Sequence, residues 1–342
     1  MTMHHTLRSA ALAVAVTLAA ILAPALVAPQ PVLAQADAGP VVRMEPIPDR
    51  PAPPPQPPAQ QAFATPEAVI AAMIAAMREP GFEALTRVLG PRVAAAVPPG
   101  ERRSVEVRRS MADQLSRMPF TISYLDAQQS RASVLFGPDR NPLPATLVRT
   151  GRGWVVDQAA TIEAMRERRI GVNEANAIRA LQALAGAQNA FRRQDSVGDG
   201  VLQFAQRIAS SPGRSDGLVP SPQGALPGAA IGLNEAFARA EGRPNDPNFR
   251  PVGGYGYRIL TAQGKAAEGG EKSYLRDGRL TEGYAVVAWP VRPGETGLST
   301  FIMDWRGKVF EREFGTDTVA AVSRMSAFDP APGWQPVEPT ER

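Results

Sequence analysis

The stretch "GVNEANAIRALQALAGAQNAFRRQ", residues 171–194, decides the fold of the second half of the chain, because its apolar side chains recur at helical spacing. Asn173 stands where a helix N-cap is expected. One stripe of the helix holds Ile178, Leu181, Ala185 and Gln188, and the neighbouring stripe holds Leu184 and Phe191. A shorter helix is expected before it, over residues 161–169. The pattern predicts a long helix packed on a sheet.

Strand-like runs follow this helix after a loop-rich stretch that ends at Pro251. They are rich in aromatic and β-branched residues, and they read "YGYRILTA", "KSYLRDG", "EGYAVVAWP", "GLSTFIMD" and "GKVFEREF". The turn "DWRG", residues 304–307, joins the last two runs, and the helix "TDTVAAVSRM" comes next. We therefore expect an α+β domain over residues 161–329, followed by a C-terminal tail over residues 330–342.

The first half of the chain places helices before strands. Thr65 is a helix N-cap and Pro66 occupies the first turn. Further helices are expected over residues 82–89 and from about Arg102. Four short strand-like runs then follow, "FTISYLDA", "RASVLFG", "PATLVRT" and "GWVVDQ". This order predicts a second α+β domain, over residues 63–160, with an antiparallel meander.

The N-terminus has the pattern of an export signal. Basic and apolar residues precede small residues placed for cleavage after Ala34 or Ala36, which predicts a signal peptide over residues 1–34. Residues 35–62 are dense in proline and predict a disordered linker. We therefore expect a periplasmic or secreted protein that keeps no integral membrane anchor after signal cleavage.

The composition excludes several classes of chemistry. The chain has no cysteine, and its two histidines lie in the predicted signal peptide. Ser-His-Asp hydrolysis, thiol catalysis, thiolate or imidazole zinc sites and ordinary haem ligation are therefore excluded. The 37 Lys and Arg residues nearly balance the 33 Asp and Glu residues, which argues against a nucleic-acid partner. Whether the protein is an enzyme stays open, but the missing residue types favour a protein without enzymatic activity.

The segment "DSVGDGVLQFAQ", residues 195–206, resembles part of a calcium-binding loop. Asp195, Asp199 and Gly200 fit the first, fifth and sixth positions of an EF-hand loop. Val197 stands at the third position and Gln206 at the twelfth, so a side-chain ligand and the closing carboxylate are missing. Two interpretations remain: weak calcium binding, or carboxylates that accept hydrogen bonds from the loop's own amides.

Two other features have competing interpretations. "GRSDG" around Ser215 matches the spacing of a nucleophile elbow, but it lacks a preceding strand and a histidine, which favours a polar turn. Aromatic residues gather in the second half and are expected mainly in the sheet core, with a surface for carbohydrate or peptide as the alternative. They are Tyr255, Tyr257, Tyr274, Tyr284, Trp289 and Trp305. No catalytic, cofactor-binding or metal-binding residue is assigned.

Three resemblances accompany these patterns. Residues 63–157 resemble nuclear-transport-factor-2-like or cystatin-like folds by the order of their elements alone. Residues 173–314 resemble the head domain of type IV pilins and type II secretion pseudopilins, without their apolar N-terminal half-helix. The residues that match the pilin hairpin are Pro293, Gly294, Thr296, Gly297, Phe301, Asp304, Gly307 and Val309.

The whole region from Phe63 to Val337 resembles an uncharacterised bacterial envelope family, the domain of unknown function DUF 2950, through segments such as "RRIGVNEANAI" and "AFDPAPGWQPV". This resemblance implies an exported protein of unestablished activity. We expect a non-enzymatic binding or assembly module for a protein partner or a cell-wall component. The alternative is a carboxylate-dependent hydrolase acting on envelope glycan, since glycoside hydrolysis needs two placed acids. The oligomeric state stays open.

Overall fold

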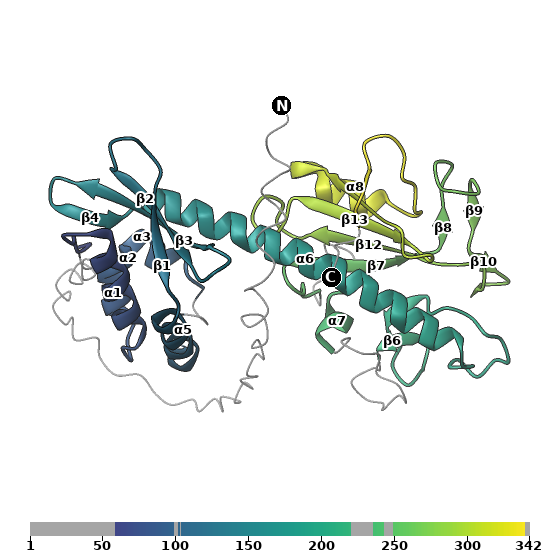
Figure 1. Cartoon of the computed structure of the whole chain (residues 1–342). Helices are drawn as coiled ribbons and strands as arrows, with labels where there is room; N and C mark the ends of the chain where they lie inside the picture. Colours follow the sequence, from purple (N-terminus) through teal and green to yellow (C-terminus); the bar gives the residue numbers. More distant parts are fainter. Residues whose placement is uncertain (1–58, 99–101, 103, 220–234, 243–248, 339–342) are drawn as a thin grey trace, which may run out of the picture. The chain divides into compact units, whose positions relative to one another are not determined.

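The computed structural model describes residues 59–98, 102, 104–219, 235–242 and 249–338 (Figure 1). The predicted signal peptide and residues 35–58 of the predicted linker lie outside these ranges. The chain forms two compact units, which divide between Ala164 and Met165. Helix α6 (Gln158–Arg192) begins in the first unit and continues into the second. Both units combine helices with antiparallel sheets, which confirms the α+β class.

The first unit follows the predicted order of helices and then a meander. Its helices are α1 (Pro66–Met77), α2 (Glu83–Leu89), α3 (Pro91–Ala96) and α5 (Val105–Arg117). Its antiparallel sheet has the order β1 (Phe120–Tyr124), β2 (Arg131–Phe136), β3 (Asn141–Thr150) and β4 (Gly153–Val156). The short helix α3, which begins at Pro91 directly after Gly90, is absent from the sequence prediction.

The core of this unit lies between α1 and one face of the sheet. Thr65 Oγ1 accepts a hydrogen bond from the Ala68 amide at 3.2 Å, as the predicted cap requires. Val69 and Ile70 of α1 are fully buried, together with the alternate residues Ala132 and Val134 of β2. The apolar residues on one face of the helix therefore pack against the alternate residues on one face of the strand and form one cluster.

The end of the predicted disordered linker is part of this fold, which corrects its boundary at residue 62. Gln60 Nε2 donates to the Val156 carbonyl at 2.8 Å, and the Gln61 amide donates to the Arg87 carbonyl at 2.7 Å. Phe63 and Trp154 exchange backbone hydrogen bonds of 2.9 and 2.7 Å. The prolines of the linker predict disorder, but Gln60 and Gln61 at its end form hydrogen bonds with β4 and α2.

The second unit is built on one five-stranded antiparallel sheet. Its order is β15 (Gln335–Pro336), β14 (Val309–Glu313), β13 (Ser299–Asp304), β12 (Ala285–Pro290) and β7 (Tyr255–Leu260). Smaller elements surround it: β5 (Arg207–Ala209), β6 (Gly217–Val219), α7 (Glu235–Arg239), β8 (Ala262–Gln263), β9 (Lys272–Ser273), β10 (Leu275–Arg276), β11 (Arg279–Leu280), the 3-10 helix η2 (Gly315–Asp317) and α8 (Thr318–Arg324).

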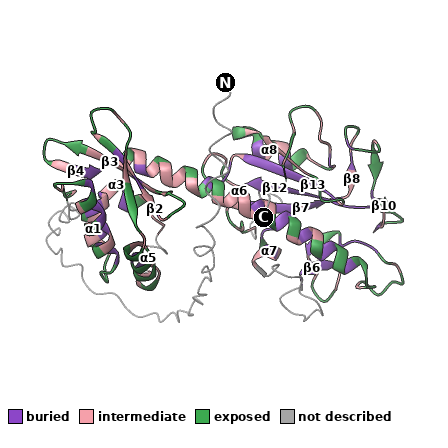
Figure 2. Ribbon diagram, in the orientation of Figure 1, coloured by how far each residue is buried: buried purple, intermediate pink, exposed green. Residues whose placement is uncertain are grey.

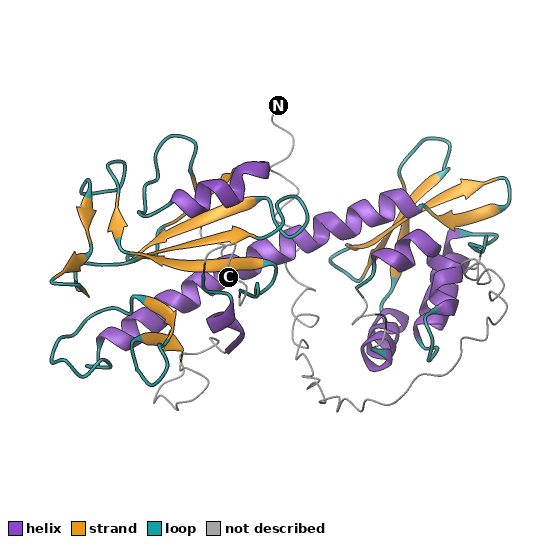
Figure 3. Ribbon diagram, turned by 180° about the vertical axis from the view of Figure 1, so that it is seen from behind, coloured by secondary structure: helices purple, strands orange, loops and turns teal. Residues whose placement is uncertain are grey.

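Helices cover both faces of this sheet, with α6 on one face and α8 on the other (Figures 1 and 3). Arg258 of β7 donates to the carbonyls of Val322 and Met325 at the end of α8. Tyr255, three residues earlier and so on the opposite face, donates from its hydroxyl to the Ser299 carbonyl at 2.9 Å. Every residue of β12 and β13 is buried as a result (Figure 2).

Two sequence predictions about this unit are wrong. The helices expected over residues 161–169 and from Asn173 are one continuous helix, α6, and Asn173 is not an N-cap. Its side chain instead donates to the Thr296 carbonyl at 2.8 Å, so a tertiary contact replaces the local one. Residues 330–338 of the predicted C-terminal tail also belong to the fold, because β15 pairs with β14, while residues 339–342 lie outside the described ranges.

One buried side chain of α6 forms the two backbone hydrogen bonds that a neighbouring strand would otherwise form. Gln188 is fully buried, and its Nε2 donates to the Ala205 carbonyl while its Oε1 accepts from the Ala205 amide, both at 2.8 Å. A carboxamide therefore reproduces the pairing of a neighbouring strand for a single residue.

We expect Gln188→Ala to lower the free energy of unfolding by about 2 kcal/mol, since the buried amide and carbonyl of Ala205 both lose their partner. Urea unfolding followed by tryptophan fluorescence measures this. Gln194→Ala, at an exposed position just beyond the same helix, is the control and is expected to change little. Equal effects of the two substitutions would contradict the assigned role of Gln188.

Candidate functional site

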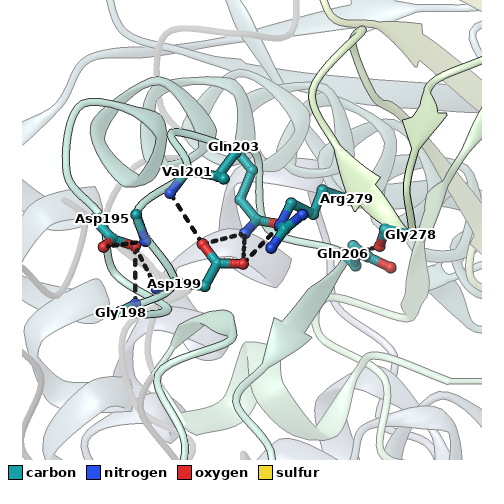
Figure 4. Close-up of polar contacts among 9 residues, drawn as sticks. Asp195, Gly198, Asp199, Val201, Gln203, Gln206, Gly278 and Arg279 are labelled. Carbon is teal, nitrogen blue, oxygen red and sulfur yellow. Dashed lines mark hydrogen bonds and ion pairs between the residues drawn. The ribbon is translucent and has the colours of Figure 1, made fainter.

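The loop after α6 is organised by the carboxylate of Asp195 (Figure 4). Asp195 Oδ1 accepts hydrogen bonds from the amides of Gly198 at 2.8 Å and Asp199 at 3.1 Å, and Oδ2 accepts from the Gly200 amide at 2.8 Å. Both glycines have φ of +78°, which L side chains rarely adopt. The Asp and Gly residues that suggest a calcium loop therefore build a tight turn.

The second carboxylate of the loop, Asp199, binds a guanidinium group. Arg279 of β11 donates from Nε to Asp199 Oδ2 at 2.8 Å, while the Val201 amide donates to Oδ1 at 3.1 Å. The hydrogen bond from Arg279 is the main cause that lowers the pKa of Asp199. Gln206 Nε2 donates to the Gly278 carbonyl at 2.8 Å, which ties the loop to the same hairpin.

The geometry favours the interpretation of this loop as a turn stabilised by its own amides over the interpretation as a calcium site. Both carboxylates accept hydrogen bonds from loop amides, as the turn interpretation expects, and the guanidinium of Arg279 already neutralises Asp199. Val197, at the third position of the motif, is 43 % exposed. Among the residues that the structure describes, no cluster of three or more His, Cys, Asp or Glu side chains has metal-binding geometry.

A second pair of carboxylates lies around β5. Glu241 accepts hydrogen bonds from the amides of Ile208 and Ala209, both at 2.7 Å, and burial raises its pKa. Asp216 accepts from the Ser211 amide at 2.6 Å and from the Ser211 hydroxyl at 2.7 Å. Burial by itself would raise the pKa of Asp216, but these hydrogen bonds lower it, and the net effect is a lowered pKa. The negative charge of Asp216 adds to the rise at Glu241.

The remaining predicted features have structural roles. Ser215 lies in the loop between β5 and β6. The short strand β5 precedes this loop, contrary to the sequence prediction, but strand β6 follows it where a nucleophile elbow needs a helix. Five of the six singled-out aromatic residues are buried, which confirms them as core: Tyr255, Tyr257, Tyr274, Tyr284 and Trp289. Trp305 is partly buried and packs against the same core, with the Arg306 guanidinium 4.9 Å from the centre of its ring.

A groove between α1 and α2 was not predicted from the sequence. It has a volume of about 510 Å³ and belongs to the first unit. Small apolar side chains, including Ala72, Ala76 and Val88, line it together with the charged residues Glu79, Glu83 and Arg87. Each helix alone shows only an apolar stripe, so the groove arises from the way the two helices pack.

These observations define a two-unit α+β protein whose carboxylates hold its loops together. The chain belongs to the family described as protein of unknown function (DUF2950), whose model matches residues 60–337. A search of curated proteins and a search of solved structures return no match. The resemblances to the nuclear-transport-factor-2-like, cystatin-like and pilin-head folds stay predictions. No helix within the described ranges is long and apolar enough to span a bilayer.

We expect millimolar calcium, added after chelation, to leave the melting temperature unchanged, because the oxygens of Asp195 and Asp199 are already hydrogen-bonded. Thermal unfolding at increasing calcium concentration measures this. A melting temperature that rises with calcium concentration would establish binding and refute this interpretation. Arg279→Ala refines the test: calcium dependence in this variant alone would show that the guanidinium excludes the ion.

We also expect Arg279→Ala to raise the pKa of Asp199 toward its ordinary range, since the guanidinium is the first cause of its lowering. Because the pKa is lowered, this interaction stabilises the fold at pH values above the ordinary pKa of Asp. The stabilisation is lost as the pH falls through the pKa of the folded state. Carboxyl chemical shifts in an NMR pH titration measure it. Arg276→Ala is the control, because Arg276 pairs with Glu282 at 2.9 Å instead.

Proposed function

We propose that the protein is an exported envelope protein, periplasmic or secreted, that acts as a non-enzymatic binding or assembly module for a protein partner or a cell-wall component. The open groove between α1 and α2 carries this proposal. The predicted signal peptide supports the location, and the proline-rich segment that leads to Gln61 supports a tethered unit.

The chemistry of the groove suits a short extended segment of a protein. It is open to solvent along its length and has a volume of about 510 Å³. The small side chains of Ala72, Ala75 and Ala76 leave room for the side chains of a ligand. The carboxylates of Glu79 and Glu83 and the guanidinium of Arg87 offer partners to polar groups at its edge.

The carboxylates of the second unit support binding over catalysis. A general acid or base needs a proton-transferring oxygen directed toward a substrate. Asp195 and Asp199 instead accept hydrogen bonds from backbone amides of their own loop, and Glu241 accepts them from the amides of Ile208 and Ala209 in β5. The histidines and cysteines that serve most hydrolases are missing from the sequence beyond residue 5.

A carboxylate-dependent hydrolase acting on envelope glycan is the second candidate, and one observation favours it. The pKa of Glu241 is raised by burial and by Asp216, as the general acid of a glycosidase requires. Turnover of purified cell-wall glycan tests it. Activity that Glu241→Gln abolishes would replace the binding proposal, whereas absence of turnover in the unaltered protein would exclude this glycan as a substrate.

We expect a photo-cross-linking amino acid at Ala75, which is exposed in the groove, to capture one dominant envelope partner in living cells. The same probe at Leu202, 54 % exposed in the Asp195 loop, is the control and is expected to capture none. Mass spectrometry identifies the adduct, and digestion by a glycan hydrolase separates a wall polymer from a protein.

Charge reversal at the groove sharpens this experiment. We expect Arg87→Glu to reduce the Ala75 adduct several-fold, because the groove then carries three neighbouring carboxylates. Arg152→Glu, an exposed change in a turn of the same unit, is the matched control. Identical capture at Ala75 and Leu202, or an adduct that neither reversal changes, would count against the groove as a binding site.

A further inference from the structure

The edge strand β1 of the first unit leaves its outer side unpaired among the described residues. The opposite edge of the same sheet, β4, is covered by Phe63, which exchanges backbone hydrogen bonds with Trp154. Strand β1 pairs with β2 on one side alone. Proteins usually protect such an edge with charge, proline or a bulge, and the five residues "FTISY" contain none of these.

The register of β1 and β2 shows which backbone groups are free. The Leu125 amide donates to the Arg131 carbonyl at 2.9 Å, and the Pro119 carbonyl accepts from the Gly137 amide at 2.8 Å. Alternate residues of an antiparallel strand direct their backbone groups to the same neighbour. Thr121 and Ser123 therefore face β2, and Phe120, Ile122 and Tyr124 present their amides and carbonyls outward.

The side chains of these outward residues lie on the apolar face of the sheet. Phe120 is paired with the buried Phe136, with ring centres 5.4 Å apart, and Tyr124 lies 6.2 Å from Trp154. Yet Phe120 is 36 % exposed and Tyr124 is 41 % exposed. The apolar layer thus continues to the edge of the sheet and ends there uncovered.

The sequence of β1 is complementary to itself in the antiparallel direction. With Ile122 opposite its own copy, Phe120 stands opposite Tyr124 of the partner copy, and Thr121 stands opposite Ser123 of the partner copy. Aromatic, β-branched and hydroxyl pairs of this kind stabilise neighbouring strands. The outward residues would exchange both of their N–H···O bonds with their opposite numbers.

We propose that β1 is a homodimerisation strand, which pairs antiparallel with β1 of a second copy of this chain about Ile122. The two four-stranded sheets become one continuous sheet, and the rings of Phe120 and Tyr124 become covered. The proposal goes beyond the proposed binding function and does not depend on it, because the groove between α1 and α2 uses other residues.

The absence of cysteine from the chain allows a test of the register. Thr121→Cys and Ser123→Cys proteins are mixed and oxidised. We expect the mixture to form disulfide-linked dimers several-fold faster than either protein alone, because the two positions are opposite in the predicted register and neither is opposite itself. Leu202→Cys, exposed in the other unit, is the control and is expected to form few dimers.

Light scattering after size exclusion tests the association without any cross-link. We expect the unaltered protein to dimerise and Tyr124→Lys to raise the dissociation constant roughly tenfold or more, since two aromatic pairs are lost. Leu202→Lys, the same kind of change at another exposed apolar residue, is expected to leave it unaltered. Far-ultraviolet circular dichroism verifies that both variants fold.

Three outcomes would overturn the proposal. A protein that is monomeric at every concentration, with random cross-linking of the mixed cysteine variants, would show that β1 does not pair with itself. A dimer that forms equally well in Tyr124→Lys would place the interface elsewhere. Capture of an unrelated polypeptide by Thr121→Cys in a monomeric protein would assign the edge to strand addition by another partner.

Discussion

The second unit depends on polar side chains of α6 that form hydrogen bonds with backbone groups in loops and at the start of strand β13. Asn173 donates to the Thr296 carbonyl at 2.8 Å, and Glu174 accepts from the amides of Leu298 at 2.8 Å and Ser299 at 3.0 Å. Gln188 pairs with Ala205 in the same manner further along the helix. Buried backbone groups need a partner, and these side chains allow irregular loops to pack closely against the sheet.

The first unit meets the same requirement with a cation. Arg108 of α5 is buried and donates from Nη2 to the carbonyls of Glu79, Pro80 and Gly81, just beyond the C-terminal end of α1. Carbonyl groups near a helix C-terminus carry partial negative charge, so a guanidinium is stabilised there without a carboxylate. One side chain thereby joins α5 to the end of α1, and the helices keep a fixed relation beside the sheet.

Local patterns in the sequence predicted most of the elements but not the contacts that join them. The Thr65 cap, the meander from Phe120 to Val156 and the turn at Asp304 follow from residues within a few positions of each other. The continuity of α6 and the pairing of Gln188 depend on partners 17 or more positions away, which periodicity does not register. The groove and the bare edge of β1 likewise depend on how elements assemble.

The motifs that suggest chemistry in this sequence share one physical origin. A carboxylate followed by glycine suits a calcium loop because it accepts several bonds at a sharp turn, and a turn's own amides satisfy it equally well. Asp195 accepts from three amides, and the Arg279 guanidinium supplies positive charge to Asp199. Carboxylates used in this way stabilise loops, so binding of a partner is expected at groups that have no hydrogen-bond partner within the protein. Such groups occur at the outer edge of β1, and an open surface occurs in the groove between α1 and α2, so the first unit is where binding is expected.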